Sequence, residues 1–142
     1  FEAFFDKRKG AQLQGVALGT SGDTSSELLW HLENELLPST LQPKVFFLLI
    51  GTNDLGKTGC SKRNALAGIL NLAQYLHEKR PKAAIVVHGL LPCGDQTNTG
   101  DYSLGMRWKQ ILWINAELKR LCAFHEAFYY MDSSDLFLER NK

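Results

Sequence analysis

The sequence predicts an α/β protein in which helices alternate with the strands of a mostly parallel sheet. Two runs, residues 45–50 and 83–90, are almost continuously apolar without alternation, which is typical of strands buried on both faces. Between them, residues 61–79 carry leucine and isoleucine at helical spacing. Single-helix crossovers predict parallel strands with helices on both faces. No repeat or linker interrupts this pattern, so residues 1–142 are predicted to form a single domain.

Composition and charge exclude several classes of function. The 142 residues carry a net charge of +1, so nothing favours a nucleic acid or a membrane surface as a partner. No apolar run approaches the ~18 residues that span a bilayer. The histidines are scattered, and Cys60, Cys93 and Cys122 lack the spacing of a zinc site, so no metal or other cofactor is expected. Unpaired cysteines slightly favour the cytoplasm, although the compartment stays open because a leader could precede Phe1.

The amino-terminal part of the chain predicts a helix end, a short strand and a second helix. Three phenylalanines in residues 1–5 share one helical face, which is followed by cations and a glycine, as in the last turn of a helix. Residues 15–19 are a strand candidate, and residues 20–23 a loop. A capping-box pattern at Thr24 then begins a helix, which Pro38 stops. Its apolar stripe consists of Leu28, Leu32 and Leu36.

The rest of the chain alternates regularly between apolar and turn-forming segments. Helices are indicated by leucine and isoleucine at helical spacing, strands by short apolar runs, and loops by glycine, proline and small polar residues. In chain order we expect a loop at 55–60, a helix at 61–79, a strand at 83–90, a long polar loop at 92–101, a helix at about 106–124, a strand at 127–131 and an exit loop at 132–135.

Three loops leave the carboxyl ends of predicted strands and share one edge of the sheet, where open α/β sheets bind ligands. They are the loop at 20–23, the residues after strand 45–50 and the loop at 92–101. Gly22 lies at the start of a helix, where unpaired backbone N–H groups face an incoming anion. Asn53 presents a side-chain amide that donates hydrogen bonds without carrying charge. A backbone N–H and an asparagine amide aimed at one point form an oxyanion hole for acyl transfer.

Both features also have a purely structural explanation. An Asn-Asp pair after a strand is most often a turn held by side-chain hydrogen bonds, and Gly22-Asp23-Thr24 is most often a helix start. Taken separately, each feature favours that explanation. Their occurrence together, one βα unit apart, favours the oxyanion hole.

The two motifs together resemble a known family. Gly19-Thr20-Ser21-Gly22-Asp23-Thr24, followed by Gly51-Thr52-Asn53-Asp54, resembles the second and third conserved blocks of the SGNH (GDSL-type) hydrolases. Within this family the chain looks most like esterases similar to the catalytic subunits of platelet-activating-factor acetylhydrolase. The likeness covers nearly the whole chain.

The resemblance implies a three-layer α/β/α fold with a flavodoxin-like parallel sheet, a Ser–His–Asp triad and an oxyanion hole. By motif position, Gly22 and Asn53 would be the oxyanion-hole donors. The blocks that hold the triad, Gly-Asp-Ser and Asp-x-x-His, do not occur in this sequence. We therefore expect a fragment, incomplete at both ends and inactive alone, of a serine-dependent hydrolase of short-chain, chiefly acetyl, esters. In the family's sheet, the first strand, which this sequence lacks, would lie between the strands at 15–19 and 45–50. Without it both of these strands would expose unpaired edges, which favours aggregation.

The alternative is a non-catalytic α/β domain that binds a ligand or another protein. Such a domain could use the same sheet edge for a phosphate or a sugar. The sequence has neither a GxGxxG motif nor a P-loop, which argues against a nucleotide site. Trp108 and Trp113 could instead serve a protein contact. His88, inside a predicted strand, is expected to be a hydrogen-bonded core or near-site residue.

Overall fold

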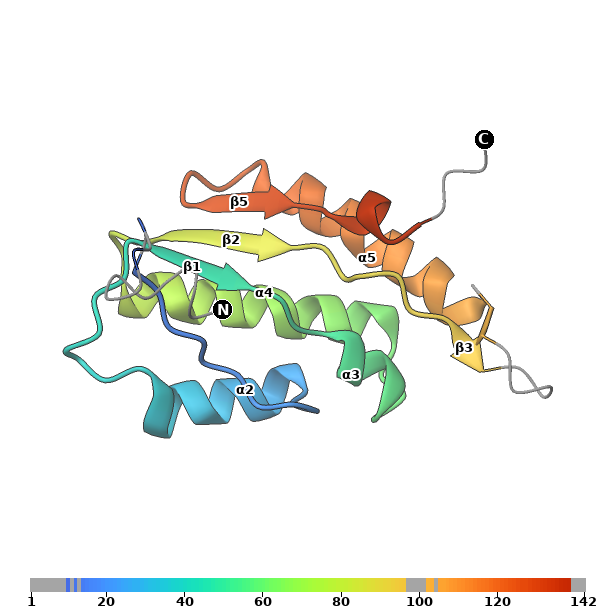
Figure 1. Cartoon of the computed structure of the whole chain (residues 1–142), viewed down its shortest axis with the longest axis horizontal. Helices are drawn as coiled ribbons and strands as arrows, with labels where there is room; N and C mark the ends of the chain where they lie inside the picture. The colour runs from blue at the N-terminus through green and yellow to red at the C-terminus, as the bar shows by residue number, and fades with distance from the viewer. Residues whose placement is uncertain (1–9, 11, 13, 97–101, 104, 139–142) are drawn as a thin grey trace.

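The structure, a computed structural model, has the α/β arrangement predicted from the sequence (Figure 1). The residues that it describes are 10, 12, 14–96, 102–103 and 105–138. Its main sheet has three parallel strands in the order β1-β2-β5. These strands are β1 (Val45–Leu48), β2 (Ala84–His88) and β5 (Phe128–Met131). Helix α4 (Lys62–Lys79) joins the first two, and α5 (Met106–Cys122) precedes the third. The predicted parallel sheet is confirmed.

Shorter elements complete the described part of the chain. Helix α2 runs beside α4 (Figure 1), and a two-stranded antiparallel ribbon follows β2 in the chain. These elements are α2 (Ser25–His31) with its π-helical continuation η2 (Leu32–Leu36), α3 (Thr52–Gly56), β3 (Asp95–Gln96), β4 (Tyr102–Ser103) and the 3₁₀ turn η3 (Ser134–Leu136). The helix end expected at residues 1–5 lies outside the described residues.

Side-chain caps begin two of the helices where the sequence predicts them. The Thr24 hydroxyl accepts from the Glu27 N–H at 3.4 Å, and the Glu27 carboxylate accepts from the Thr24 N–H at 2.8 Å. This reciprocal pair is the capping box expected at the start of α2. The Ser61 hydroxyl caps α4 by accepting from the Asn64 N–H at 3.2 Å. Both caps satisfy backbone donors that a helix leaves unpaired in its first turn.

The hydrophobic core lies on one face of the sheet, between the strands and helices α4 and α5. Alternate residues of a strand point to opposite faces, and the central strand buries Ile85 and Val87 completely. Helix α4 packs against β2, α5 packs against β5, and the two helices contact each other. The fully buried helical side chains of this core are Ile69, Leu72, Ile111, Ile114 and Leu118. Burying each of them stabilises the fold by roughly 1.5–3 kcal/mol.

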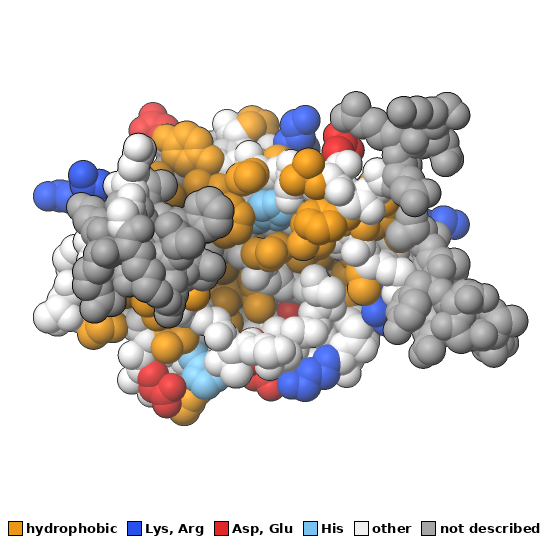
Figure 2. Space-filling view, in the orientation of Figure 1, with side chains coloured by type: hydrophobic (Ala, Val, Ile, Leu, Met, Phe, Trp, Pro, Cys, Tyr) orange, Lys and Arg blue, Asp and Glu red, His pale blue; other side chains and the backbone are white. Residues whose placement is uncertain are grey.

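The second face of the sheet is exposed in the described part of the chain, which corrects one expectation. The sequence predicts a strand at 45–50 that is buried on both faces. In the structure this strand ends at Leu48, and its Val45 and Phe47 side chains are 54% and 57% exposed. Tyr129 and Met131 on β5 are also about half exposed, and Figure 2 shows hydrophobic side chains gathered over the strands around a histidine. Helices α4 and α5 both pack on the first face, so one face alone is buried.

Two further expectations about local structure are wrong. Residues 15–19, predicted as a strand, form neither a strand nor a helix, and Val16 is 59% exposed. A strand needs a hydrogen-bonded neighbour, and in the described sheet β1 pairs only with β2. Residues 52–56, predicted as loop, form α3, because the Leu55 side chain is buried in the core cluster.

Asn115 joins α5 to the end of the central strand, and its removal should destabilise the fold. Its Oδ1 accepts from the Leu90 N–H at 2.7 Å, and its Nδ2 donates to the Leu90 carbonyl at 2.9 Å. Both residues are buried, so Asn115→Ala leaves the Leu90 donor and acceptor without partners. We expect a loss of about 1–3 kcal/mol in the free energy of unfolding, measured by urea denaturation. Asn71→Ala on the exposed surface of α4 is the matched control, and equal losses in both variants would refute this role.

Candidate active site

The carboxyl edge of the sheet carries the two residues that the sequence analysis singles out. Gly22 lies in a turn closed by the Asp23 N–H, which donates to the Thr20 carbonyl at 3.2 Å. Its φ of +90° lies in the left-handed region, which glycine adopts without strain. Within the described chain, no group accepts a hydrogen bond from the Gly22 N–H. This N–H is therefore available to a ligand.

Asn53 lies in the first turn of α3, and its side chain reaches the turn that contains Gly22. The Asn53 Nδ2 donates to the Asp23 carbonyl at 2.9 Å, across 30 residues of sequence. An amide nitrogen carries two hydrogens, so this bond orients the group and leaves a second hydrogen to donate. The Lys57 Nζ also lies 3.5 Å from the Gly22 carbonyl. The structure thus brings the segments of Gly22 and Asn53 into contact.

The residue after Asn53 forms a buried connection that the sequence analysis missed. The Asp54 Oδ2 accepts from the Ser25 N–H at 2.9 Å, and Oδ1 accepts from the Ser25 hydroxyl at 2.5 Å. Asp54 and Ser25 are only 5% and 6% exposed. The aspartate follows a predicted strand and the serine begins a predicted helix, but nothing in their spacing of 29 residues indicates the contact.

Glu27 links the capping box to α3. Hydrogen bonds from the backbone and hydroxyl of Thr24 and from Lys57 lower the pKa of Glu27 from its ordinary 4.5 to about 2. The Lys57 Nζ lies 3.1 Å from its Oε1, and both side chains are about half exposed. The ionised carboxylate is therefore the form that supports the start of α2.

Replacing Glu27 by glutamine should remove a pH-dependent part of the stability. The pKa of Glu27 is lower in the folded chain, about 2 against 4.5, so its contribution is complete above pH 4.5 and is lost as the pH falls toward 2. The difference in Tm between wild type and Glu27→Gln should therefore be constant near neutral pH and shrink below about pH 4. Thermal melts across this range would measure it. Glu33→Gln, on an exposed part of η2, is the control, and an equal pH profile in both variants would contradict the prediction.

A serine–histidine pair lies where β2 and β5 end. The His88 Nδ1 lies 2.5 Å from the Gly89 carbonyl, and Nε2 lies 2.8 Å from the Ser133 Oγ. The carbonyl only accepts, so Nδ1 donates to it. In the neutral imidazole, Nε2 then accepts from the Ser133 hydroxyl. His88 is 4% exposed, which confirms the expectation of a hydrogen-bonded core residue. The pair fixes the turn after β5 to the central strand.

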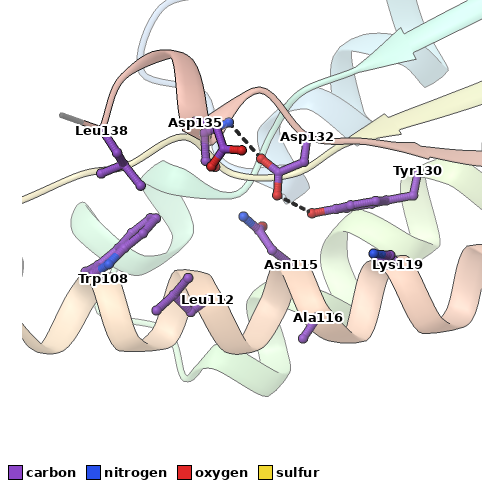
Figure 3. Close-up of a pocket in the computed structure, with 10 residues that line it drawn as sticks. Trp108, Leu112, Asn115, Ala116, Lys119, Tyr130, Asp132, Asp135 and Leu138 are labelled. Carbon is purple, nitrogen blue, oxygen red and sulfur yellow. Dashed lines mark hydrogen bonds between the residues drawn. The ribbon is translucent and has the colours of Figure 1, made fainter. Parts of the chain in front are cut away.

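A separate cavity of about 320 Å³ lies between α5 and the residues that follow β5 (Figure 3). The Asp132 carboxylate accepts from the Tyr130 hydroxyl and from the Ser134 N–H, each at 2.8 Å. Burial opposes ionisation of Asp132, but hydrogen bonds from Ser134 and Tyr130 hold the pKa of its carboxyl below the usual range. Burial and the bond to Asp132 raise the pKa of Tyr130. Neither Gly22 nor Asn53 lines this cavity.

The cysteines and the acidic and histidine side chains of the described residues form no further site of a recognisable kind. Cys60, Cys93 and Cys122 are free thiols, and burial raises the pKa of Cys122. Within residues 14–96 and 105–138, no cluster of three or more histidine, cysteine or acidic side chains could hold a metal ion. None of the described helices is long and apolar enough to cross a membrane.

Comparison with known proteins identifies the family. The profile of the GDSL-like lipase/acylhydrolase family matches residues 1–142. The chain belongs to this family. Platelet-activating factor acetylhydrolase IB subunit alpha1 of Bos taurus is 36% identical over 126 residues, which cover 89% of this chain and 50% of that protein. The alpha2 subunit of Homo sapiens is 35% identical over 86 residues, which cover 61% of this chain and 36% of that protein. The resemblance inferred from the motifs is thus confirmed.

Solved structures show the same fold. A Streptococcus pneumonia protein assigned as a platelet activating factor has a TM-score of 0.72 at 21% identity, covering 92% of this chain and 60% of that one. A Bacteroides fragilis protein assigned as an acylhydrolase has a TM-score of 0.70 at 16% identity, covering 97% and 62%. The GDSL-family chain therefore shares the fold of these two structures, and its described residues form the parallel sheet and one helical layer of an α/β/α arrangement. It spans about half the length of the curated alpha1 relatives that it matches.

Proposed function

We propose that the protein containing this chain hydrolyses acyl esters by a serine-dependent mechanism, in which Gly22 and Asn53 donate hydrogen bonds to the oxyanion. The observation that carries this proposal is the bond of 2.9 Å between the Asn53 Nδ2 and the Asp23 carbonyl, in a chain of the acylhydrolase family. This bond orients the amide next to the Gly22 turn. The Gly22 N–H and the second hydrogen of Asn53 Nδ2 are uncharged donors of the kind that stabilise a tetrahedral intermediate.

The proposed reaction has two halves. A serine hydroxyl attacks the ester carbonyl while a histidine takes its proton, and the carbonyl oxygen becomes an oxyanion held by Gly22 and Asn53. The intermediate collapses to an acyl-serine, and the histidine returns the proton to the departing alcohol. Water then attacks the acyl-serine in the same way and releases the acid. The serine and the acid–base pair would come from Gly-Asp-Ser and Asp-x-x-His blocks, which this sequence does not contain.

A short acyl group, chiefly acetyl, is the proposed substrate class. Its support is similarity, because the mammalian relatives are named as platelet-activating factor acetylhydrolase subunits. The steps above need neither a metal ion nor an organic cofactor. A small-molecule ester is thus the only ligand that the proposal requires.

Sequencing the transcript on both sides of this chain tests the proposal first. We expect a strand ending in Gly-Asp-Ser about 20 residues upstream and an Asp-x-x-His block downstream. The encoded protein should then hydrolyse p-nitrophenyl acetate and react at that serine with a fluorophosphonate probe. If the serine or the histidine is absent, or if no probe attaches, the hydrolase proposal fails. Gly22 and Asn53 would then be a helix start and a turn in a ligand-binding domain.

A further inference from the structure

Two segments far apart in the sequence contact each other through Asn53 and the residues that follow it. Residues 22–27 contain the Gly22 turn and the start of α2, and residues 53–57 contain most of α3. We call the contacts between them the α2–α3 clasp. Its three pairs are Asn53 with Asp23, Asp54 with Ser25, and Lys57 with Glu27.

The pair of Asp54 and Ser25 is the buried part of the clasp. Both carboxylate oxygens accept from the same residue, one from its N–H at 2.9 Å and one from its hydroxyl at 2.5 Å. Bonds to an ionised group are stronger than neutral ones, and burial keeps water from competing for them. The pair of Lys57 and Glu27 is about half exposed and is therefore screened by solvent. The aspartate thus dominates the connection.

The surroundings of this pair leave it little freedom to move. A Cβ added to Gly68 of α4 would clash with the Ser25 Oγ and would lie 3.6 Å from the Asp54 Oδ1. On the other side, the Asp54 carbonyl accepts from the Thr58 hydroxyl at 2.8 Å and from the Cys60 N–H at 2.9 Å. The backbone of α4 and the turn after α3 therefore hold the buried pair between them.

We propose that Asp54 is a positioning residue that fixes Asn53 relative to Gly22, an inference that rests on the proposed function. Two donors on separate elements serve one oxyanion only when each is held within about 0.5 Å of its productive position. The single bond from Asn53 to the Asp23 carbonyl allows the side chain to pivot. The bonds of Asp54, the next residue, fix the backbone that carries Asn53 to the first residue of α2.

Asp54 acts through Asn53 and not as an acid or a base. Both of its oxygens already accept hydrogen bonds, and the side chain is 5% exposed. A proton-transfer group has to reach the reacting atoms, directly or through one water. The carboxylate faces Ser25 and α4, so its effect on the reaction has to pass through geometry.

The test is a double-mutant cycle of Asp54→Asn and Asn53→Ala in the full-length protein. Asp54→Asn is isosteric, but it turns one acceptor into an NH₂ group that faces the Ser25 donors. We expect kcat to fall about 10- to 100-fold with KM unchanged, since a misplacement of about 1 Å can cost 10²-fold. In the Asn53→Ala background the same change should cost less than about 3-fold, because the group that Asp54 positions is gone. Equal losses in both backgrounds would overturn the proposal.

Two further variants sharpen this result. Ser25→Ala keeps the N–H bond to Asp54 and loses only the hydroxyl, so its kcat should lie between those of wild type and Asp54→Asn. Glu33→Gln removes a carboxylate from an exposed part of η2 and should leave kcat unchanged. If Asn53→Ala lowers kcat and Asp54→Asn does not, the positioning role fails while the proposed function stands.

A measurement that does not depend on catalysis tests the role of Asp54 even if the proposed function fails. In ¹H–¹⁵N NMR spectra, the Asn53 side-chain amide should exchange its hydrogens with solvent about 10-fold faster in Asp54→Asn than in wild type, with no such change in Glu33→Gln. An unchanged Asn53 exchange rate in a folded Asp54→Asn protein would refute the inference. An absence of esterase activity in wild type, with the NMR effect present, would refute only the proposed function.

Discussion

Replacing Asn53 by alanine in the full-length protein is expected to lower kcat by roughly 10²–10³-fold with little change in KM. The amide is held 2.9 Å from the Asp23 carbonyl, so its second hydrogen is oriented before substrate arrives. An oxyanion carries its full negative charge only in the intermediate and the flanking transition states. A donor aimed at that charge therefore stabilises the transition state more than the bound ester. Steady-state kinetics on a short-chain ester would measure both constants.

The control for Asn53→Ala is Asn64→Ala, which removes an exposed asparagine from the first turn of α4. This variant should keep wild-type kcat and KM. Asn53→Asp is a second comparison, because it preserves shape and replaces the donor by a negative charge that repels an oxyanion. Its kcat should fall at least as far as that of Asn53→Ala. A rise in KM with kcat retained in Asn53→Ala would mean that the residue binds the ground state, and the oxyanion-hole assignment would be abandoned.

Local signals in the sequence predict most of the described elements. The capping box at Thr24 depends on residues three positions apart, and Ser61 caps α4 in the same short-range way. The helix predicted at 61–79 is α4, and the strands predicted at 83–90 and 127–131 contain β2 and β5. Such signals operate within one turn of helix or one run of strand, so one sequence suffices to find them.

The incorrect predictions for residues 45–50 and 15–19 arise because the structure there depends on residues that are distant in the sequence. An apolar run such as 45–50 shows that a strand forms, but its burial depends on what packs on each face, and β1 has one face exposed in the described chain. The segment at 15–19 has strand-like composition, but no described strand pairs with it. Strand formation requires a partner backbone, which local composition does not encode.

The same distinction applies to the candidate site. Gly22 and Asn53 are predicted from motifs that follow predicted strands, because parallel strands bring such residues to one edge of the sheet. The structure confirms that their segments are in contact, and their role as donors stays a proposal. Ser25 with Asp54, and His88 with Ser133, are contacts across 29 and 45 residues of sequence. Each depends on the register of neighbouring elements and on their packing. The long-range contacts that support the proposed site are therefore harder to predict from sequence than Gly22 and Asn53, which carry local motifs.

Gly51→Ala is expected to cause the largest loss of stability among these variants. Gly51 precedes α3 with φ +118° and ψ −13°, a conformation in which a Cβ is strained. The added Cβ would also lie 2.8 Å from the Ile69 Cδ1 and 3.3 Å from the Leu90 Cδ2, in the core. Strain and overpacking each cost about 1–3 kcal/mol, so the free energy of unfolding should fall by about 2–5 kcal/mol. Thermal denaturation should show a Tm lower by roughly 5–15 °C.

Gly59→Ala separates the two causes of that loss. Gly59 also has a positive φ, +64°, but nothing lies within 4 Å of an added Cβ. This variant should therefore show the strain alone, about 1–2 kcal/mol, and the excess in Gly51→Ala measures the packing against Ile69 and Leu90. Equal losses in the two variants would mean that the core relaxes around the new methyl group. Gly51 lies two residues before Asn53, so the backbone shift that this packing forces should also displace the Asn53 amide. Gly51→Ala should therefore lower kcat, whereas Gly59→Ala should not.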